Sequence, residues 1–366
     1  MRRAVLAVFV SLAACASGKE AAVTWPTLDG KPPLIIAHRG ASGYLPEHTL
    51  EAYALAIEQG ADVVEPDLVF TKDGVLVARH DRYLSTTTNV ADKPEFAGRK
   101  RANNEPNTEP REDWWVEDFT LAELKTLRAR QPFPGRTKEH DDKFEIPTFA
   151  EMLTLVAAKS KEAGRPVGVY PETKHPGYFA SIGHDFEAPL LEALEGFDAG
   201  PVFIQSFEPE ILKRLKVRTN AKLVQLVYEK EPGAGPNIPL DEIATYADGV
   251  GPAKELATGG RRAPTSFVVR AHSLGLLVHP WTFRDDRPNT AFQRAAAVDA
   301  IEAPDASGLY IVSVNVEIDW ERLGVPNASG DELHDYLWFR GADGVFTDFP
   351  RSAVTVRNRL LHRDQN

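Results

Sequence analysis

The sequence has 366 residues, a length that suits either one large domain or two ordinary ones. Hydrophobic residues make up 43% of it, which is enough to build a core, and the 26% of charged residues is usual for a globular protein. The net charge of −11 argues against nucleic acid as a partner, because a phosphate backbone binds to basic surfaces. A small phosphodiester is not excluded, since it needs only a local positive site.

Residues 1–18 have the pattern of an export leader. A basic start at Arg2 and Arg3 precedes an apolar run, and small residues follow. The only cysteine, Cys15, ends the run Leu-Ala-Ala-Cys, which resembles a bacterial lipobox in which the cysteine is lipidated. The alternative is a soluble protein cut at an ordinary A-x-A site. We therefore expect an exported, periplasmic protein, anchored to the envelope through a lipid on Cys15.

Short β-rich runs alternate with helical segments along the rest of the chain, which is typical of parallel α/β architecture. Strands are expected at residues 34–37, 63–67, 75–80, 167–171, 202–205, 223–226, 249–251, 276–279 and 344–347. The turn after the second strand is too short for a parallel crossover, so the second and third strands form an antiparallel hairpin. The others number eight, which predicts a single TIM (β/α)8 barrel domain over residues 33–357, with an extra β-hairpin.

Helix signals fill the intervals between the strands. An apolar stripe predicts a helix over residues 49–59 that Gly60 ends. Residues 82–146 break the alternation, because they are polar and contain prolines. A helix is expected there over residues 121–130, opened by a capping box at Thr120, and a second box at Thr148 opens the next helix. We expect this small insertion to lie at the barrel mouth, since long loops are usually functional or form subdomains.

Polar residues gather at the ends of the expected strands, where a TIM barrel holds its active site. They are His38, Arg39, Glu65, Asp67, His80, Glu172 and Lys174. Glu65 and Asp67 are two residues apart, so they point to the same side of an extended chain. Three carboxylates without cysteine favour a hard cation, Ca²⁺ or Mg²⁺, over zinc. A general acid, a general base, an anion clamp and cation ligands together indicate metal-assisted cleavage of a phosphate ester.

Each of these signals has an ordinary structural explanation when taken alone. An E-x-D pair is more often a solvated strand end than a metal site, and a carboxylate beside a lysine is usually a surface ion pair. The coincidence at strand ends is what favours a site. The hairpin adds a geometric prediction: with Asp73 and Gly74 as a two-residue turn, Asp67 lies opposite His80 in the ladder.

The order of the motifs carries a family resemblance. The motifs are HRG (38–40), PEHT (46–49), E-x-D (65–67), HD (80–81), E-x-K (172–174) and GVFTDFP (344–350). Their set resembles the glycerophosphodiester phosphodiesterase family, and more narrowly its exported, periplasmic branch, which includes lipoproteins. The resemblance runs from about residue 33 to the last strand, but residues 287–333 match nothing in it. Many family members have PENT in place of PEHT, so no catalytic role is assigned to His48.

The resemblance implies a role for each charged site residue. Glu65, Asp67 and Glu172 would hold the divalent metal, Ca²⁺ in this branch, with Mg²⁺ as the alternative. Arg39 and Lys174 would bind the phosphate, the first through its forked guanidinium and the second as a point charge.

The remaining site residues would act on protons and on the alcohol. His38 and His80 would be the acid–base pair, without a decision as to which is the acid. Glu47 would orient Arg39 or approach the metal, although it also has an ordinary role as an acid near a helix start. Phe207 and Trp281, just past strand ends, could cover an alcohol headgroup, with a cation–π contact if it is choline; ordinary packing is the alternative.

The implied reaction is the hydrolysis of deacylated phospholipids, such as glycerophosphocholine and glycerophosphoethanolamine, to sn-glycerol 3-phosphate and an alcohol. In the family mechanism the neighbouring glycerol hydroxyl attacks first, and water opens the resulting cyclic phosphate. One rival is a phospholipase-type phosphodiesterase of the same barrel group acting on intact lipid. Another is a surface lipoprotein that uses the barrel for binding. The expected partner is thus a small molecule, and the only membrane contact is the lipid on Cys15.

The leader can be tested by changing its cysteine. We expect Cys15→Ser to move the protein from the membrane fraction to the soluble fraction, because the variant lacks the sulfur that would carry the lipid. Cell fractionation and immunoblotting measure this distribution. An unchanged distribution would favour simple cleavage of a signal peptide.

Overall fold

The computed structural model describes residues 25–103, 105, 109–257, 264–288 and 320–361. The interpretation of residues 1–18, with Cys15, lies outside these residues. Most of the segment 287–333, which matched nothing, also lies outside them. Within the described part of the chain, no helix combines the length and the apolar character needed to cross a membrane.

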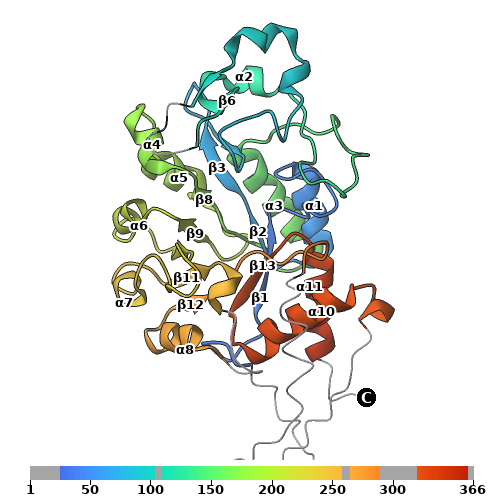
Figure 1. Cartoon of the computed structure of the whole chain (residues 1–366), viewed down its shortest axis with the longest axis vertical. Coiled ribbons are helices and arrows are strands. Elements are labelled where there is room, and N and C mark those ends of the chain that lie inside the picture. The colour runs from blue at the N-terminus through green and yellow to red at the C-terminus, as the bar shows by residue number, and fades with distance from the viewer. Residues whose placement is uncertain (1–24, 104, 106–108, 258–263, 289–319, 362–366) are drawn as a thin grey trace, which may run out of the picture.

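Parallel strands form the centre of the molecule (Figure 1). They are β1 (Leu34–His38), β2 (Val63–Glu65), β3 (Asp67–Phe70), β7 (Gly168–Val169), β8 (Glu172–Thr173), β9 (Phe203–Ser206), β10 (Lys222–Val227), β11 (Gly249–Pro252), β12 (Leu277–Val278) and β13 (Gly344–Thr347). Since β2 with β3, and β7 with β8, are interrupted single strands, the described residues contain the eight parallel strands that were predicted. Each expected strand is confirmed in position.

The backbone ladders divide these strands into two sheets. One has the order β13-β1-β2-β7, and the other has the order β12-β11-β10-β9-β8-β3, with β4 (Leu76–Ala78) added at its edge. Single parallel bridges, Val169 with Val202 and Phe283 with Thr347, span the two joints between the sheets. The strand order is therefore that of a (β/α)8 barrel, although the ladder is interrupted.

Two prolines account for the interruption. Pro66 separates β2 from β3, and Pro171 precedes β8; neither has a backbone N–H to give to a ladder. The carbonyl of Pro66 accepts a hydrogen bond from the backbone N–H of Glu172 at 2.8 Å, so the two breaks lie at the same level of neighbouring strands. Glu65 and Asp67 flank the first break and Glu172 follows the second. The break in the sheet is thus where three acids come together.

Helices surround the strands. They are α1 (Leu50–Glu58), α3 (Phe149–Ala163), α4 (Pro176–Ser181), α5 (Glu187–Leu194), α6 (Pro209–Leu215), α7 (Leu240–Ile243), α8 (Ser266–Ser273), α10 (Asn327–His334) and α11 (Pro350–Leu361). Figure 1 shows α4 to α8 along one side of the strands and α1, α3 and α11 along the other. Apolar residues on the inner faces of these helices and on the strands form one large buried cluster. The interior of the barrel holds a smaller one, formed by Ile36, Val63, Tyr170, Phe203, Val224 and Phe346.

The predicted hairpin forms, but its predicted register is wrong by one residue. Phe70 pairs with Leu76, so Asp67 lies opposite Arg79 and accepts its backbone N–H at 2.9 Å. The cause is a three-residue loop instead of a two-residue turn. Thr71 closes this loop, because its Oγ1 accepts the backbone N–H of residue 75 at 2.9 Å and donates to an aspartate within the loop. His80 is therefore the first residue beyond that pair.

The insertion stands at one end of the molecule, above β3 (Figure 1). Its elements are η1 (Val90–Asp92), η2 (Pro94–Arg99), β5 (Arg101–Ala102), β6 (Glu112–Asp113), η3 (Val116–Asp118) and α2 (Leu121–Leu124). The predicted helix over 121–130 is wrong in length, since α2 ends at Leu124. Its capping box is confirmed, but Arg128 and Ala129 pair instead with Asn89 and Thr88.

The second capping box, at the start of α3, is also confirmed and gives a stability prediction. Thr148 Oγ1 accepts the N–H of Glu151 at 3.1 Å, and the Glu151 carboxylate accepts the N–H of Thr148 at 2.7 Å. We expect Thr148→Ala to lower the free energy of unfolding by about 1 kcal/mol. Denaturant titration measures this loss. Thr154→Ala, in the exposed interior of the same helix, is the control and should stay within about 0.5 kcal/mol of the parent; equal losses would show that the cap contributes nothing special.

Candidate active site

Three carboxylates meet at the interrupted strands. Glu65 ends β2, Asp67 begins β3 and Glu172 begins β8, and one oxygen from each lies within 4.8 Å of the others. All three side chains are buried. Of the residues that the structure describes, these alone form a group of three or more potential metal ligands. An all-oxygen set of this kind fits a hard divalent cation, so the three could hold a metal ion.

Two cations contact the same carboxylates. Lys174 Nζ lies 2.8 Å from Glu172 Oε1 and 3.8 Å from Asp67 Oδ1. Arg39 Nε lies 3.3 Å from Asp67 Oδ2, and its Nη1 donates to Glu47 Oε2 at 3.0 Å. Glu47 therefore contacts Arg39, and its role in orienting that side chain stays a prediction.

Burial and mutual repulsion shift the pKa values of the acids. Burial raises the pKa of Glu65 well above its usual range, and the two other carboxylates raise it further. Burial also raises the pKa of Glu172, to about 8. Burial acts in the same direction on Asp67, but nearby cations, led by Lys174, hold its pKa well below its usual range. A bound divalent cation would offset this concentration of negative charge, which supports the fit of the three residues to a metal.

The backbone after β1 is shaped to present Arg39. This residue has a φ of 59° and Gly40 a φ of 84°, so two successive residues adopt the left-handed conformation. A Cβ at position 40 would lie 2.7 Å from the backbone of Ala52, which only glycine avoids. The turn lets the backbone N–H of Arg39 donate to Glu65 Oε2 at 2.9 Å. Unusual backbone of this kind persists where the surroundings hold it, often at functional sites.

The two predicted acid–base residues each have a carboxylate partner. His38 Nδ1 lies 2.6 Å from Asp348 Oδ1, and His80 Nδ1 lies 2.7 Å from Asp81 Oδ1. Burial lowers the pKa of His38 to about 4 and also lowers that of His80, and the positive charge of Arg39 acts in the same direction on both. In both imidazoles the shift favours the neutral form in the free site.

Sequence reasoning missed two groups that hold the acids in place. His48, which was set aside, is buried and bridges Asp67 Oδ2 at 2.9 Å and the Tyr53 hydroxyl at 2.8 Å. Gln205 at the end of β9 donates to Glu65 Oε1 at 3.1 Å. Gln205 follows the same rule as the other site residues, a polar side chain at a strand end, and that rule could have found it. No comparable signal marks the contact of His48.

One cavity collects these groups. Its volume is about 490 Å³, within the usual range for small-molecule sites. It is lined by His38, Arg39, Glu65, His80, Glu172, Lys174, Gln205, Phe207, Leu226, Lys254, Glu255, Trp281, Thr282, Arg284, Arg287 and Phe346. The rings of Phe207 and Trp281 meet edge to face, 5.8 Å apart. Of the predicted site residues, only Asp67 and Glu47 are absent from this lining, and each contacts a residue that belongs to it.

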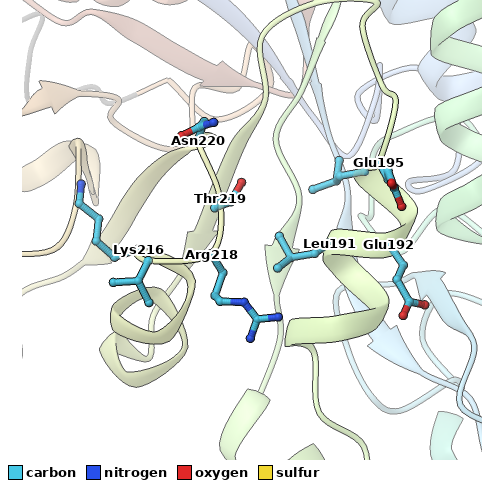
Figure 2. A pocket seen from close by; sticks show the side chains of 9 residues that line it. Leu191, Glu192, Glu195, Lys216, Arg218, Thr219 and Asn220 are labelled. Atoms are coloured by element: carbon cyan, nitrogen blue, oxygen red, sulfur yellow. The ribbon is translucent and has the colours of Figure 1, made fainter.

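A larger hollow lies elsewhere, between α5 and the segment that follows α6 (Figure 2). Its volume is about 640 Å³, and its lining residues are Leu191, Glu192, Leu194, Glu195, Lys216, Val217, Arg218, Thr219 and Asn220. None of the predicted site residues is among those described as lining it. The predicted site residues line the smaller cavity instead, so size alone does not mark the larger hollow as the reaction site.

Comparisons with known proteins agree with this fold and site. Residues 38–352 match the model of the glycerophosphoryl diester phosphodiesterase family. The chain is 38% identical over 284 residues to glycerophosphodiester phosphodiesterase GDPD6 of Arabidopsis thaliana, covering 69% of this chain and 75% of that protein. It is 32% identical over 366 residues to a glycerophosphodiester phosphodiesterase of Haemophilus influenzae, covering 88% of each.

A solved structure supports the fold. A phosphodiesterase of Oleispira antarctica, determined in complex with the product sn-glycerol-3-phosphate, superposes with a TM-score of 0.57. It is 19% identical to this chain, and the match covers 91% of this chain and 99% of that one. With the TIM-barrel fold and the acidic site, the matches define a phosphoric diester hydrolase. The chain belongs to the glycerophosphoryl diester phosphodiesterase family.

Proposed function

We propose that the chain hydrolyses glycerophosphodiesters such as glycerophosphocholine and glycerophosphoethanolamine to sn-glycerol 3-phosphate and an alcohol. The observation that carries the proposal is the meeting of three kinds of group in one cavity. The buried carboxylates of Glu65 and Glu172, the cations of Arg39 and Lys174, and two imidazoles all face it. The names of the relatives support the same substrate class.

Arg39 and Lys174 are suited to hold the phosphate. Lys174 is buried and Arg39 is partly buried beside the acidic cluster, so water screens their charge poorly when a ligand enters the cavity. The planar guanidinium of Arg39 can donate two parallel hydrogen bonds to phosphate oxygens. Lys174 adds a point charge from the end of β8, and the two cations together fix the orientation of the diester.

His38 and His80 are suited to move the protons. One removes a proton from the attacking oxygen, and the other gives a proton to the departing alcohol. The base acts as a neutral imidazole, whereas the acid has to carry its proton as an imidazolium before it can give one to the departing alcohol.

Glu65, Asp67 and Glu172 would hold a divalent metal, and we propose Ca²⁺. The ion would supply charge neutralisation for the phosphate oxygens as negative charge grows on them. The preference for Ca²⁺ over Mg²⁺ rests on the family resemblance, since the three carboxylates by themselves fit either hard cation.

Phe207 and Trp281 are suited to cover the alcohol. Their edge-to-face rings form an apolar wall of the cavity, and Glu255 lines the same cavity. Two aromatic rings of this kind could cover a cationic headgroup such as choline or ethanolamine.

We also propose that the protein is exported and anchored through Cys15. The support is the sequence pattern of residues 1–18 alone. A periplasmic location would bring the enzyme to deacylated phospholipids outside the cytoplasm.

A coupled assay for glycerol 3-phosphate tests the substrate and the metal together. Glycerophosphocholine should yield glycerol 3-phosphate; excess EDTA should abolish its release, and added Ca²⁺ should restore it better than Mg²⁺. Intact phosphatidylcholine should yield none. Full activity after exhaustive treatment with EDTA would refute the metal assignment, and release from intact lipid alone would favour the phospholipase alternative.

Substitution of each histidine tests the acid–base pair. We expect His38→Ala and His80→Ala each to lower kcat by about 10²–10⁴-fold, because each removes a group that transfers a proton. Steady-state kinetics on glycerophosphocholine measure the loss. The control is His184→Ala, since this ring stacks on Phe70 outside the cavity and should keep the parent rate. Near-parental turnover in either catalytic variant would contradict its assignment.

A further inference from the structure

Asp348 is a buried carboxylate that directly follows β13 and touches one of the two histidines. Its Oδ1 lies 2.6 Å from His38 Nδ1. Its Oδ2 accepts hydrogen bonds from Arg136 Nη2 at 2.6 Å and from Arg284 Nε at 2.8 Å. The carboxylate is 1% exposed, so these three partners take the place of water around it. They also hold its pKa well below the usual range, against the opposing effect of burial, and it stays ionised.

Arg136 comes from the insertion and connects it with the loop after β1. The Arg136 side chain is 2% exposed, and its Nη1 donates to the carbonyl of Ser42 at 3.1 Å. Gln131 Nε2 donates to the same carbonyl at 2.9 Å. Ser42 Oγ in turn donates to the carbonyl of His38 at 2.8 Å. The insertion therefore reaches His38 by two routes, through the Asp348 carboxylate and through the backbone of the loop.

The contacts of His38 decide where its proton lies. Arg39 Nε lies 3.2 Å from His38 Nε2, and an arginine Nε can only donate, so Nε2 is the accepting nitrogen. The single proton of the neutral imidazole is then on Nδ1, where the Asp348 carboxylate accepts it. This tautomer leaves Nε2, the nitrogen on the Arg39 side, without a proton.

The second histidine lacks such a fixed partner. Asp81, which contacts His80 Nδ1, is the next residue in the chain and is 22% exposed. Among the residues that the structure describes, no arginine forms an ion pair with Asp81, whereas two arginines form ion pairs with Asp348. The two histidines thus differ in their carboxylate partners. The partner of His38 is distant in sequence, whereas the partner of His80 is the next residue.

We propose that Asp348 is a positioning residue that fixes the tautomer of His38 in which Nε2 carries no proton, and that Arg136 of the insertion holds Asp348 in place. The inference rests on the acid–base role proposed for His38, and it goes beyond that role by making His38 the base of the first step. It also gives the insertion a function, because its segment from residue 131 to 136 is part of the support of the active site.

The substitution Asp348→Asn tests the proposal with little change of shape. An asparagine amide can turn its NH₂ toward His38 Nδ1, which then has to accept, and the proton moves to Nε2. We expect kcat on glycerophosphocholine to fall by about 10²–10⁴-fold with little change in KM, because the group affected acts on protons more than on binding. The ¹⁵N NMR signals of the His38 ring should change from the Nδ1–H pattern to the Nε2–H pattern, which is a readout independent of activity.

A matched control is available at the other end of β13. Asp343 directly precedes β13, is also buried, and its Oδ2 also lies 2.9 Å from a histidine, His272, that is outside the cavity. Asp343→Asn should lose stability without a fall in kcat of the folded protein. Parental kcat in Asp348→Asn, or a loss of kcat with an unchanged His38 tautomer, would overturn the proposal.

A second variant examines the insertion and leaves the two histidines and Asp348 unchanged in sequence. We expect Arg136→Ala to lower kcat by about ten- to a hundredfold, because Arg136 contacts the residue that orients His38 and does not contact the substrate itself. Arg130→Ala is its control, since Arg130 pairs with Asp92 and Asp142 within the insertion and does not line the cavity. Equal rates in the two variants would overturn the role of Arg136.

The result for His38→Ala separates this inference from the proposed function. If His38→Ala is inactive while Asp348→Asn keeps the parental rate, only the positioning role is wrong. If His38→Ala itself is active, the acid–base assignment is wrong and the positioning role is lost with it.

Discussion

Repulsion among three buried carboxylates is the constraint on which the rest of the site depends. Glu65, Asp67 and Glu172 bring their oxygens within 4.8 Å of one another, in a place that excludes most water. Like charges in such surroundings are costly unless opposite charge or hydrogen-bond donors face them. The neighbouring residues supply both. Lys174 and Arg39 contribute charge, while His48 and Gln205 contribute donors.

The residues that compensate the charge of the three acids do not pair with them one to one; a single acid can have several such partners. Asp67 alone contacts Arg39, Lys174 and His48, and Arg39 in turn contacts Glu47. Removing one member would leave its neighbours with an uncompensated charge, which costs about 3–5 kcal/mol for a buried pair. The site is therefore a single charge network, and its geometry is set by strand ends that no other part of the chain can replace. Two prolines, Pro66 and Pro171, interrupt the ladder at the level of the acids.

Much of the fold could be predicted because strand runs and caps are local signals. The strands and both capping boxes were found in this way, whereas the hairpin register depended on whether Thr71 would close a longer loop. The site residues at strand ends were predictable for a topological reason: parallel strands bring their ends together. The role of Arg136 could not be predicted, since its partner Asp348 is 212 residues away in the sequence. Nothing in the sequence of the polar insertion distinguishes this arginine from the others there.

The hydrogen bond between Asp348 and His38 also has a consequence for the stage of folding at which the enzyme becomes active. His38 and Asp348 are separated by 310 residues, and Asp348 reaches its place only when β13 pairs with β1. Contacts so distant in sequence form late in folding, because the loop between them must close first. A chain still being synthesised or translocated lacks this last strand and holds an imidazole without its partner. Closure of the barrel would thus coincide with the onset of catalysis, so that a partly folded chain could bind its charged ligand before it could cleave it.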